Sequence, residues 1–236
     1  MNILIINASG RTGSAIAREL SGSESNLILT SGSSNSVDGM EAIKWRYDGE
    51  DSVDSLFNDV KSKYDEIHAV VNCLGSIFLK PAHLTKKEDF DNVLDLNLRS
   101  SFFIIKNSIP LMRKNGGSLL FFSSAAANIG LSNHEAIAAA KAGLEGLVKS
   151  AAATYAKNNI RVNALALGLV ESNLSKSIIS NPAALEVSKK MHSIGSIGSS
   201  EIIAKFATPL ILDSSSWITG SIINIDGGLS TTKLVS

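Results

Sequence analysis

The chain has 236 residues, of which 44% are hydrophobic and 19% are charged, and this composition excludes a disordered or collagen-like chain. The formal net charge is zero, so no strong field attracts nucleic acid or anionic lipid, and we expect neither as a partner. Cys73 is the one cysteine, which excludes an internal disulfide and a cysteine-based metal site. We expect a cytoplasmic protein without a signal peptide or a membrane span.

Short apolar runs alternate with helical segments along the whole chain. The predicted strands are 2–6, 26–30, 42–47, 69–72, 118–122, 161–165 and 221–225. The predicted helices are 13–20, 52–63, a long one containing 90–105, then 136–157 and 201–212, and the polar run 32–39 predicts a loop. Continuous apolar strands between helices indicate a parallel sheet covered on both faces. We therefore predict one Rossmann-type domain over residues 1–236, a three-layer α/β fold with a doubly wound parallel sheet.

The segment after the first strand has the composition of a phosphate-binding loop. Close approach of the backbone to a pyrophosphate requires small residues, and the start of the next helix offers free N–H groups. Gly10 and Gly13 meet that need, and Asn7 tolerates a positive φ where a glycine is usual. The predicted cofactor-binding residues here are Asn7, Ser9, Gly10, Arg11, Thr12 and Gly13. The alternative is an ordinary turn between a strand and a helix.

The end of the second strand bears on the choice of coenzyme. An NAD site usually places an acidic residue here to hold the ribose 2′-hydroxyl, but the sequence has Ser31, Gly32 and Ser33. The two serines and the Arg11 guanidinium can instead bind a 2′-phosphate. We therefore favour NADP over NAD, with a simple solvated loop as the alternative reading of the serines.

With these motifs in order, the chain resembles the short-chain dehydrogenase/reductase family from end to end. The matching segments are Asn72–Gly75, Asp48, Asn97, Ser123–Ser124, Ala140–Gly143, Asn163–Gly168 and Ile218–Gly228. The resemblance implies that Asp48, Asn72, Gly75 and Gly168 contact the coenzyme. It implies that Ser124 binds the substrate oxygen, that Lys141 holds the nicotinamide ribose, and that Asn97 carries a water relay. Within the family, the chain is most similar to reductases that act on acyl thioesters.

The chain departs from the family pattern at one catalytic position. The family has a tyrosine four residues before the lysine, where it exchanges a proton with the substrate, but this chain has Ile137. Isoleucine cannot transfer a proton, so that contribution to general acid–base catalysis is absent. Asn7 and Leu167 also replace a glycine and a proline of the pattern.

His134 is the candidate replacement for this proton donor. It lies three residues before Ile137 and seven before Lys141, which predicts the same helix face, and histidine titrates near neutral pH. In enoyl-thioester reductases, which the chain resembles here, the active tyrosine stands seven residues before the lysine. The alternative is a helix-capping or surface histidine. Ser124 and Asn97 also have structural alternatives. Ser124 would then only bind the backbone of its loop, and Asn97 would only bend its helix.

The sequence favours two classes of function over a third, a nonredox lyase or isomerase, for which it offers no positive evidence. The first is an NAD(P)(H)-dependent oxidoreductase that reduces a small-molecule carbonyl or an activated C=C bond with an atypical proton donor. The second is a non-catalytic NADP(H)-binding regulatory protein, which the replacement of the tyrosine would explain. The family resemblance further implies a homo-oligomer, a tetramer or a dimer, and a substrate lid at about residues 174–198. No histidine or cysteine spacing predicts a metal site.

Overall fold

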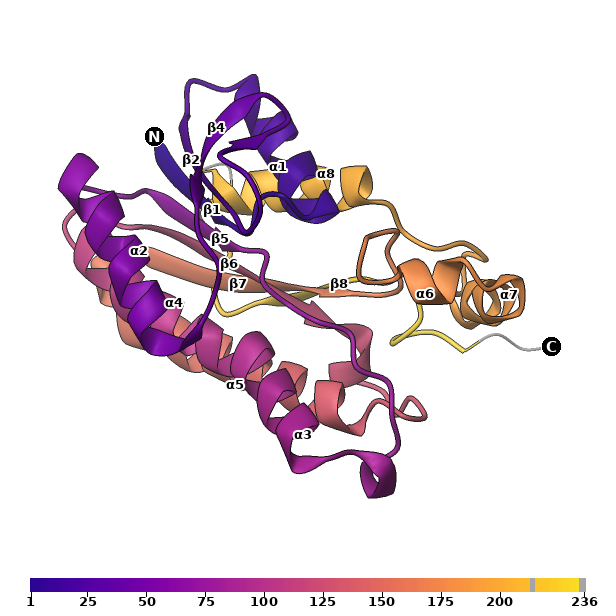
Figure 1. Ribbon diagram of the computed structural model, residues 1–236. Coiled ribbons are helices and arrows are strands. Elements are labelled where there is room, and N and C mark those ends of the chain that lie inside the picture. Colours follow the sequence, from indigo (N-terminus) through magenta and orange to yellow (C-terminus); the bar gives the residue numbers. More distant parts are fainter. Residues whose placement is uncertain (213–214, 234–236) are drawn as a thin grey trace.

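Eight strands form one sheet in the order β3-β4-β2-β1-β5-β6-β7-β8, as the computed structural model shows for residues 1–212 and 215–233 (Figure 1). All neighbouring strands are parallel except β3, which pairs antiparallel with β4 at one edge. The strands are β1 (Asn2–Ile6), β2 (Asn26–Ser31), β3 (Ser36–Val37), β4 (Met40–Lys44), β5 (Ala69–Asn72), β6 (Gly117–Ser124), β7 (Ile160–Leu167) and β8 (Ile222–Ile225). The predicted doubly wound three-layer α/β fold is confirmed.

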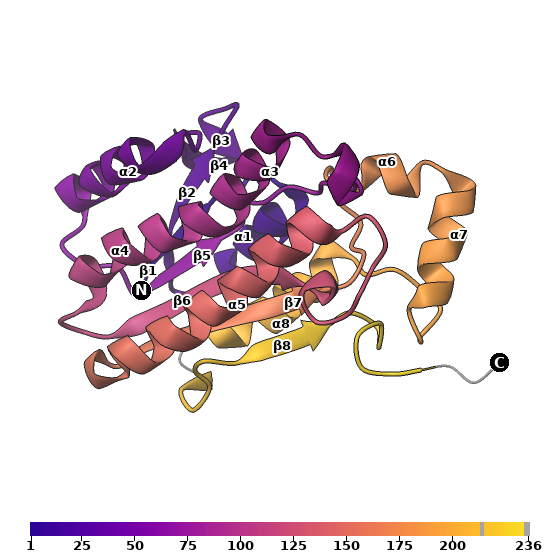
Figure 2. The same ribbon diagram turned by 90° about the horizontal axis from the view of Figure 1, so that it is seen from below.

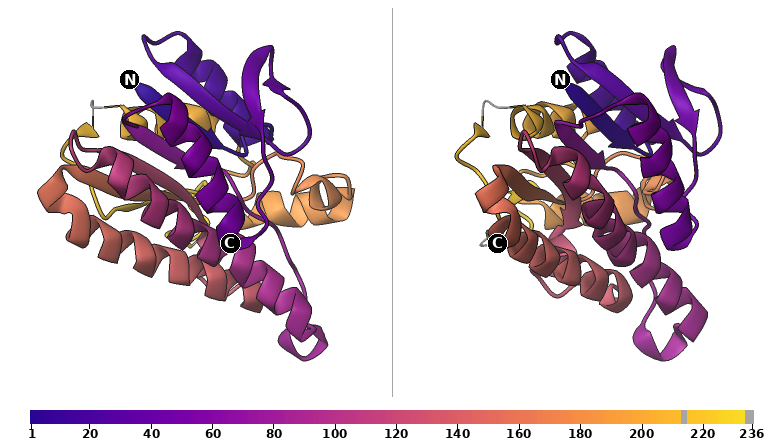
Figure 3. Two further views of the ribbon diagram at one scale, coloured as in Figure 1. Left: turned by 60° about the vertical axis from the view of Figure 1, so that its left-hand side comes forward. Right: turned by 90° about the vertical axis from the view of Figure 1, so that its left-hand side faces the viewer.

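Helices cover both faces of this sheet. One layer contains α1 (Arg11–Ser21) and α8 (Ser200–Ile211), and the other contains α2 (Gly49–Lys63), α3 (Lys87–Leu94), α4 (Ser100–Met112) and α5 (Glu135–Tyr155). Figures 2 and 3 show the second layer, coloured purple to salmon, on the opposite side of the sheet from the indigo α1 and the yellow α8. None of the described helices has the length and apolarity needed to cross a membrane.

The apolar strands are buried on both faces, and β1 shows why the sequence has this pattern. Leu4 and Ile6 belong to the core cluster beneath α2, α4 and α5, whereas Ile3 and Ile5 belong to the cluster beneath α1 and α8. All four side chains are fully buried. A central parallel strand therefore has no polar face, and its polar residues follow its carboxyl end.

Three predictions about individual elements were wrong in detail. The predicted loop 32–39 contains β3. The predicted strand 42–47 is β4, which begins at Met40 and ends at Lys44, the residue that pairs with Ser31 at the end of β2. The predicted long helix is divided between α3 and α4 by the π-helical turn η2 (Asp95–Arg99). The Asn97 side chain donates a hydrogen bond to the Val93 carbonyl within this turn, at 3.0 Å.

The segment predicted as a substrate lid lies at the carboxyl end of the sheet. It contains α6 (Lys176–Ile179) and α7 (Pro182–Met191), which project together beyond β7 (Figure 1). The segment ends at Gly198, which forms an isolated bridge with Val170, beyond the end of β7. Within this segment, His192 is buried and accepts a hydrogen bond from the Leu169 N–H at 3.1 Å.

Candidate active site

A cavity of about 480 Å³ opens at the carboxyl ends of β1, β5, β6 and β7. Its wall brings together many of the residues that the sequence singled out: Asn7, Ser9, Gly10, Arg11, Thr12, Gly13, Gly75, Ser124, Ile137, Lys141 and Gly168. The rest of the wall includes Ser33, Cys73, Ser76 and a set of apolar side chains. Parallel strands place their polar loops at one edge, which is why segments far apart in sequence meet here.

The loop between β1 and α1 is shaped to approach a ligand closely. Asn7 has a φ of 59°, its N–H donates to the Thr30 hydroxyl at 2.8 Å, and its side-chain amide donates to the Cys73 carbonyl at 3.3 Å. A Cβ at Gly13 would lie 2.8 Å from the Ala8 Cα, so only glycine permits this packing. Helix α1 begins directly after Gly10 without a side-chain cap, which leaves its first N–H groups available to an anion.

The residues predicted to read the 2′-position occupy different places. Ser33 lies on the cavity wall. Ser31 is fully buried, and its hydroxyl accepts hydrogen bonds from the N–H groups of Ser33 and Ser34, at 3.3 Å each. The Arg11 guanidinium contacts the Glu171 carboxylate at 2.5 Å, and both side chains are about half exposed. Ser31 thus shapes the turn that presents Ser33.

Lys141 is the buried cation of the site. Its side chain is 7% exposed, and Nζ donates a hydrogen bond to the Phe122 carbonyl at 2.7 Å. Burial lowers the pKa of Lys141 to about 8, because removal from water disfavours the charged form. A Cβ built at Gly75 would lie 3.8 Å from this Nζ and 3.3 Å from Asn97 Oδ1, so Gly75 separates the two polar groups without a side chain of its own.

Asn97 supports the cavity wall from behind. Its side chain is 1% exposed, Oδ1 accepts from the Ser76 N–H at 3.1 Å, and Nδ2 donates to Ser76 Oγ at 2.9 Å. The π-helical geometry of η2 places this amide against the loop after β5, and π-helical turns are frequent at functional sites. Asn97 is not among the residues that line the cavity, whereas Ser76 and Gly75 are.

Ser124 ends β6 and begins a 3₁₀ turn. Its hydroxyl oxygen accepts a hydrogen bond from the Ala126 N–H at 3.2 Å, so the hydroxyl hydrogen remains available to a ligand. The preceding Ser123 donates to Glu145 at 2.7 Å, and Asn128 donates to the same carboxylate oxygen at 3.1 Å. Glu145 is 6% exposed and lies one helical turn after Lys141. Glu145 was not predicted as a site residue, although a carboxylate on the buried face of an alanine-rich helix needs a partner.

Ile137 and His134 lie in different surroundings. Ile137 is 5% exposed, lines the cavity, and packs in a small apolar cluster with Val93, Ala136 and Ala140. His134 is the N-cap residue of α5, and its Nδ1 lies 2.8 Å from the Ser132 carbonyl oxygen. It is not among the residues that line the cavity. The structure therefore does not bring His134 together with Ser124 and Lys141.

The remaining sequence-predicted residues divide in the same way. Gly168 lines the cavity, and a Cβ there would lie 2.5 Å from His192 Nε2. Asn72 is buried, where it donates to Ser101 Oγ at 3.1 Å and accepts from the Leu74 N–H at 3.0 Å, so it holds the loop after β5. Asp48 is the N-cap residue of α2 and is not among the cavity residues.

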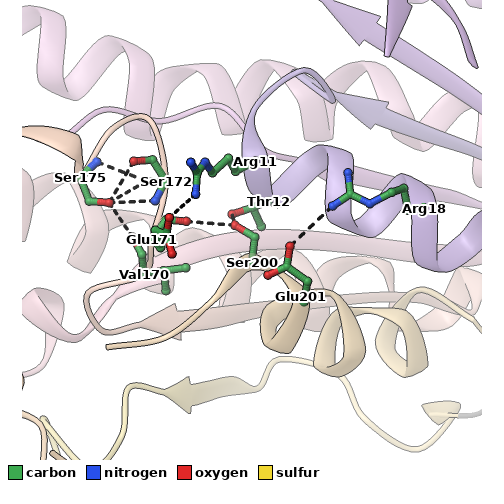
Figure 4. Close-up of polar contacts among 9 residues, drawn as sticks. All are labelled: Arg11, Thr12, Arg18, Val170, Glu171, Ser172, Ser175, Ser200 and Glu201. Carbon is green, nitrogen blue, oxygen red and sulfur yellow. Dashed lines mark hydrogen bonds and ion pairs between the residues drawn. The ribbon is translucent and has the colours of Figure 1, made fainter. Parts of the chain in front are cut away.

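Several residues after β7 complete the wall. Leu169, Val170, Ser172 and Asn173 were not predicted, whereas Leu174 and Ser175 belong to the predicted lid segment. Figure 4 shows how the segment is held: Ser175 Oγ donates to the Val170 carbonyl at 2.6 Å, and Ser200 Oγ donates to the Glu171 carbonyl at 3.2 Å. Their position directly after a predicted strand was the signal in the sequence that could have identified them as lining residues. No group of three or more potential metal ligands occurs in the part of the chain that the structure describes.

Comparison with known proteins agrees with this arrangement. The family model described as enoyl-(acyl carrier protein) reductase matches residues 12–230. The 3-oxoacyl-[acyl-carrier-protein] reductase FabG of Thermotoga maritima is 34% identical over 182 residues, which cover 76% of this chain and 72% of that protein. The FabG of Rickettsia felis is 30% identical over 233 residues, which cover 96% and 95%. A tropinone reductase homolog of Arabidopsis thaliana is 30% identical over 179 residues, 75% of this chain and 56% of that protein.

A solved structure extends the similarity to the whole described fold. The ligand-free aldohexose dehydrogenase of Thermoplasma acidophilum superposes with a TM-score of 0.91 at 25% identity, covering 100% of this chain and 96% of that one. The match spans the sheet, both helical layers and the loops that form the cavity. The chain belongs to the short-chain dehydrogenase/reductase family of oxidoreductases.

Proposed function

We propose that the protein is an NAD(P)H-dependent reductase of a small-molecule carbonyl or activated C=C bond. The observation that carries the proposal is the cavity wall, which joins an anion-binding loop to Ser124 and Lys141. A bound nicotinamide coenzyme would supply the hydride. The protein supplies the binding surface and the polar groups around the reacting atoms.

The residues present fit a dinucleotide. The contact between Gly13 and Ala8 lets the backbone approach a pyrophosphate, and the uncapped start of α1 stabilises its charge. Gly75 and Gly168 keep the wall open where side chains would otherwise fill it. The Nζ of Lys141 makes one hydrogen bond to protein and can donate further hydrogen bonds to ribose hydroxyls.

We favour NADP(H) over NAD(H) as the coenzyme. The wall near the end of β2 offers Ser33 and Arg11 and no acidic residue that would repel a 2′-phosphate. ElxO, whose fold is similar at a TM-score of 0.89 and 24% identity, has been solved with NADP bound. The Glu171 carboxylate pairs with Arg11 and would compete with a 2′-phosphate for it.

Ser124 and the apolar wall define how a substrate binds. The Ser124 hydroxyl would donate to the oxygen of a carbonyl or thioester, while Asn97 fixes the adjacent loop through Ser76. Leu74, Ile77, Phe122, Leu167 and Leu174 line the cavity and suit an acyl chain. The two relatives named 3-oxoacyl-[acyl-carrier-protein] reductase have names that indicate an acyl substrate. A 3-oxoacyl or enoyl thioester is therefore the favoured substrate class.

A protein that binds NADP(H) without turnover is the second candidate. Ile137 favours it, because the position faces the cavity and carries no proton. The retention of Ser124, Lys141 and Asn97 favours the enzyme, since a protein that only binds nucleotide has no need of all three.

One experiment separates the two functions. NADPH binding is measured by calorimetry, and NADPH oxidation is followed with acetoacetyl-CoA, crotonyl-CoA and trans-1-decalone as probes. Oxidation with any probe supports the reductase. Tight NADPH binding without oxidation supports the binding protein, and the absence of NADPH and NADH binding contradicts both. The His134→Ala variant tests His134 as proton donor: a rate loss of about 10²-fold or more is the result expected of a general acid.

We also propose that the chain forms a homo-oligomer. Phe102 on α4 is 54% exposed, and β8 has a strand neighbour on one side only in the sheet. Both features suit contacts between copies through the long helices and the last strand. Light scattering during size-exclusion chromatography distinguishes a dimer or tetramer from a monomer.

A further inference from the structure

Few side chains on the cavity wall can exchange a proton. Among the described residues that line it, the titratable ones are Arg11, Cys73 and Lys141. Arginine stays charged in proteins, and burial raises the pKa of the Cys73 thiol to about 12. Neither group is a useful acid near neutral pH. Lys141 is the remaining one.

The surroundings of Lys141 leave its ammonium group without a compensating negative charge. Its hydrogen bond goes to a backbone carbonyl, that of Phe122. Glu145 lies one turn further along α5, and its carboxylate accepts hydrogen bonds from Ser123 and Asn128.

Charged groups on the neighbouring elements are paired elsewhere. Asp95 and Arg99 on η2 pair with each other, with 3.9 Å between Nη1 and Oδ1, and Arg11 on the phosphate loop pairs with Glu171. The desolvated ammonium of Lys141 therefore releases its proton readily, and burial is the cause of its lowered pKa.

Ile137 contributes directly to this state. It stands one turn before Lys141 on α5 and lines the same cavity. An apolar side chain there adds to the desolvation and provides no hydrogen-bond acceptor. Isoleucine at position 137, where the family has a tyrosine, thus removes one proton donor and at the same time makes Lys141 a stronger acid.

We propose that Lys141 itself delivers the proton that completes the reduction, instead of only holding the coenzyme. This inference rests on the proposed function. A bound NADPH would transfer a hydride to the carbonyl carbon, or to the β-carbon of an enoyl group, and by losing these two electrons would be oxidised to NADP⁺. As that bond forms, an N–H bond of Lys141 breaks and the carbonyl oxygen, or the α-carbon, gains its proton. The neutral amine then regains a proton from water. Ser124 orients the substrate oxygen through its hydroxyl.

The first test needs no substrate. The protein without coenzyme is acetylated with trace acetic anhydride over a pH series, and the modification of each lysine is read by mass spectrometry. We expect Lys141 to become reactive with a midpoint near pH 8, well below that of Lys106, whose pKa the Glu50 carboxylate raises. A Lys141 profile that coincides with that of Lys106 would overturn the inference.

The second test compares the protein with its Lys141→Arg variant. Arginine keeps the charge and the hydrogen-bond donors but does not release a proton in this pH range. We expect the NADPH affinity of the variant, measured by calorimetry, to stay within about threefold of that of the unsubstituted protein. Single-turnover NADPH oxidation, measured with a probe that the unsubstituted protein reduces, should fall by about 10²–10⁴-fold. The unsubstituted protein should lose rate as the pH rises above about 8, because the acid must be protonated.

The outcomes separate the inference from the proposed function. A Lys141→Arg variant that turns over within about threefold of the unsubstituted protein overturns the inference and leaves the reductase standing. If the unsubstituted protein oxidises NADPH with none of the probes, both the reductase and the inference are contradicted. If the variant does not fold, the pH profile of the unsubstituted protein decides: a rate that is flat between about pH 7 and about pH 9 rejects Lys141 as the acid.

Discussion

Ser123 and Glu145 join the end of β6 to α5 through a buried hydrogen bond of 2.7 Å. Ser123 directly precedes Ser124, and Glu145 follows Lys141 by one helical turn. The bond therefore fixes Ser124 and Lys141 relative to each other. Asn128 adds a second donor to the same carboxylate oxygen, from the turn that follows Ser124.

Replacement of Glu145 should separate its acceptor role from its volume. Glu145→Leu leaves Ser123 and Asn128 without their acceptor, so the free energy of unfolding should fall by about 1–3 kcal/mol, measured in urea. Glu145→Gln keeps one acceptor oxygen and should lose less stability and retain more of the NADPH oxidation rate. Equal losses in both variants would show that the oxygen is not what matters.

Gly13→Ala should block coenzyme binding. The new Cβ would lie 2.8 Å from the Ala8 Cα, which forces the phosphate loop to move. We expect NADPH affinity to fall by at least about tenfold, or about 1.4 kcal/mol. Gly22→Ala at the other end of α1 is the matched control, because nothing lies within 4 Å of its Cβ and its φ is −80°. Similar affinities for the two variants would contradict the proposed loop.

Arg11 and Glu171 should set the preference for NADPH over NADH. Arg11→Ala should weaken NADPH binding and leave NADH nearly unchanged, while Glu171→Gln should strengthen NADPH binding by releasing Arg11. The pair is half exposed, so each effect should be about 0–1 kcal/mol, or up to about fivefold. Arg18→Ala is the control, since Arg18 pairs with Asp38 and Glu201. An equal loss of both coenzymes in Arg11→Ala would rule out 2′-phosphate recognition by this residue.

Lys141 should make the stability of the fold depend on pH. Its pKa falls from 10.5 in the unfolded chain to about 8 in the folded one, so the unfolded state binds more protons and stability rises with pH between these values. The free energy of unfolding should increase by about 1 kcal/mol between about pH 7 and about pH 9 relative to Lys141→Met. The difference between the two proteins removes the opposing contribution of Cys73, which both share. A constant difference would mean that Lys141 titrates normally.

Ile137→Tyr should add a second proton donor to the cavity wall. Ile137 faces both Lys141 and the cavity, so a phenol can enter the open space instead of the apolar cluster. We expect NADPH oxidation with acetoacetyl-CoA to rise by about tenfold, less than the full range of general acid catalysis, because the proposed acid Lys141 is already present. Ile137→Phe has nearly the same volume without the hydroxyl and should show no gain. An equal rise in both variants would assign the effect to packing.

The sequence was sufficient to predict the elements that depend on strong local patterns. The bounds of β1 and β5 agree with prediction. Each is a short, mainly apolar run with an asparagine at or just after its end, Asn7 or Asn72, and this pattern predicts a buried strand. The loop between β1 and α1 also lies where the sequence predicts it, since glycines after a buried strand and before a helix indicate a turn; its binding of phosphate stays a prediction.

Other features depend on contacts that periodicity does not contain. The turn η2 follows from the bonds of Asn97 to Val93 and Ser76, which join distant segments. Helical spacing alone puts His134 and Lys141 on one face, but His134 precedes the first helical residue, with φ and ψ of −106° and 10°. Its side chain therefore does not follow the helix face. Glu145 escaped notice because its partners, Ser123 and Asn128, are known only from the fold.

The π-helical turn η2 limits how the length of this chain can vary. A π-helical turn contains one residue more than the α-helical turn it replaces, so deletion of a single residue from Asp95–Arg99 would give a continuous helix from α3 into α4. That helix would be more regular, yet it would rotate Asn97 away from Ser76 and the wall beside Gly75. Substitutions in this stretch are therefore easier to accommodate than insertions or deletions, even though the helix is far from any chain end.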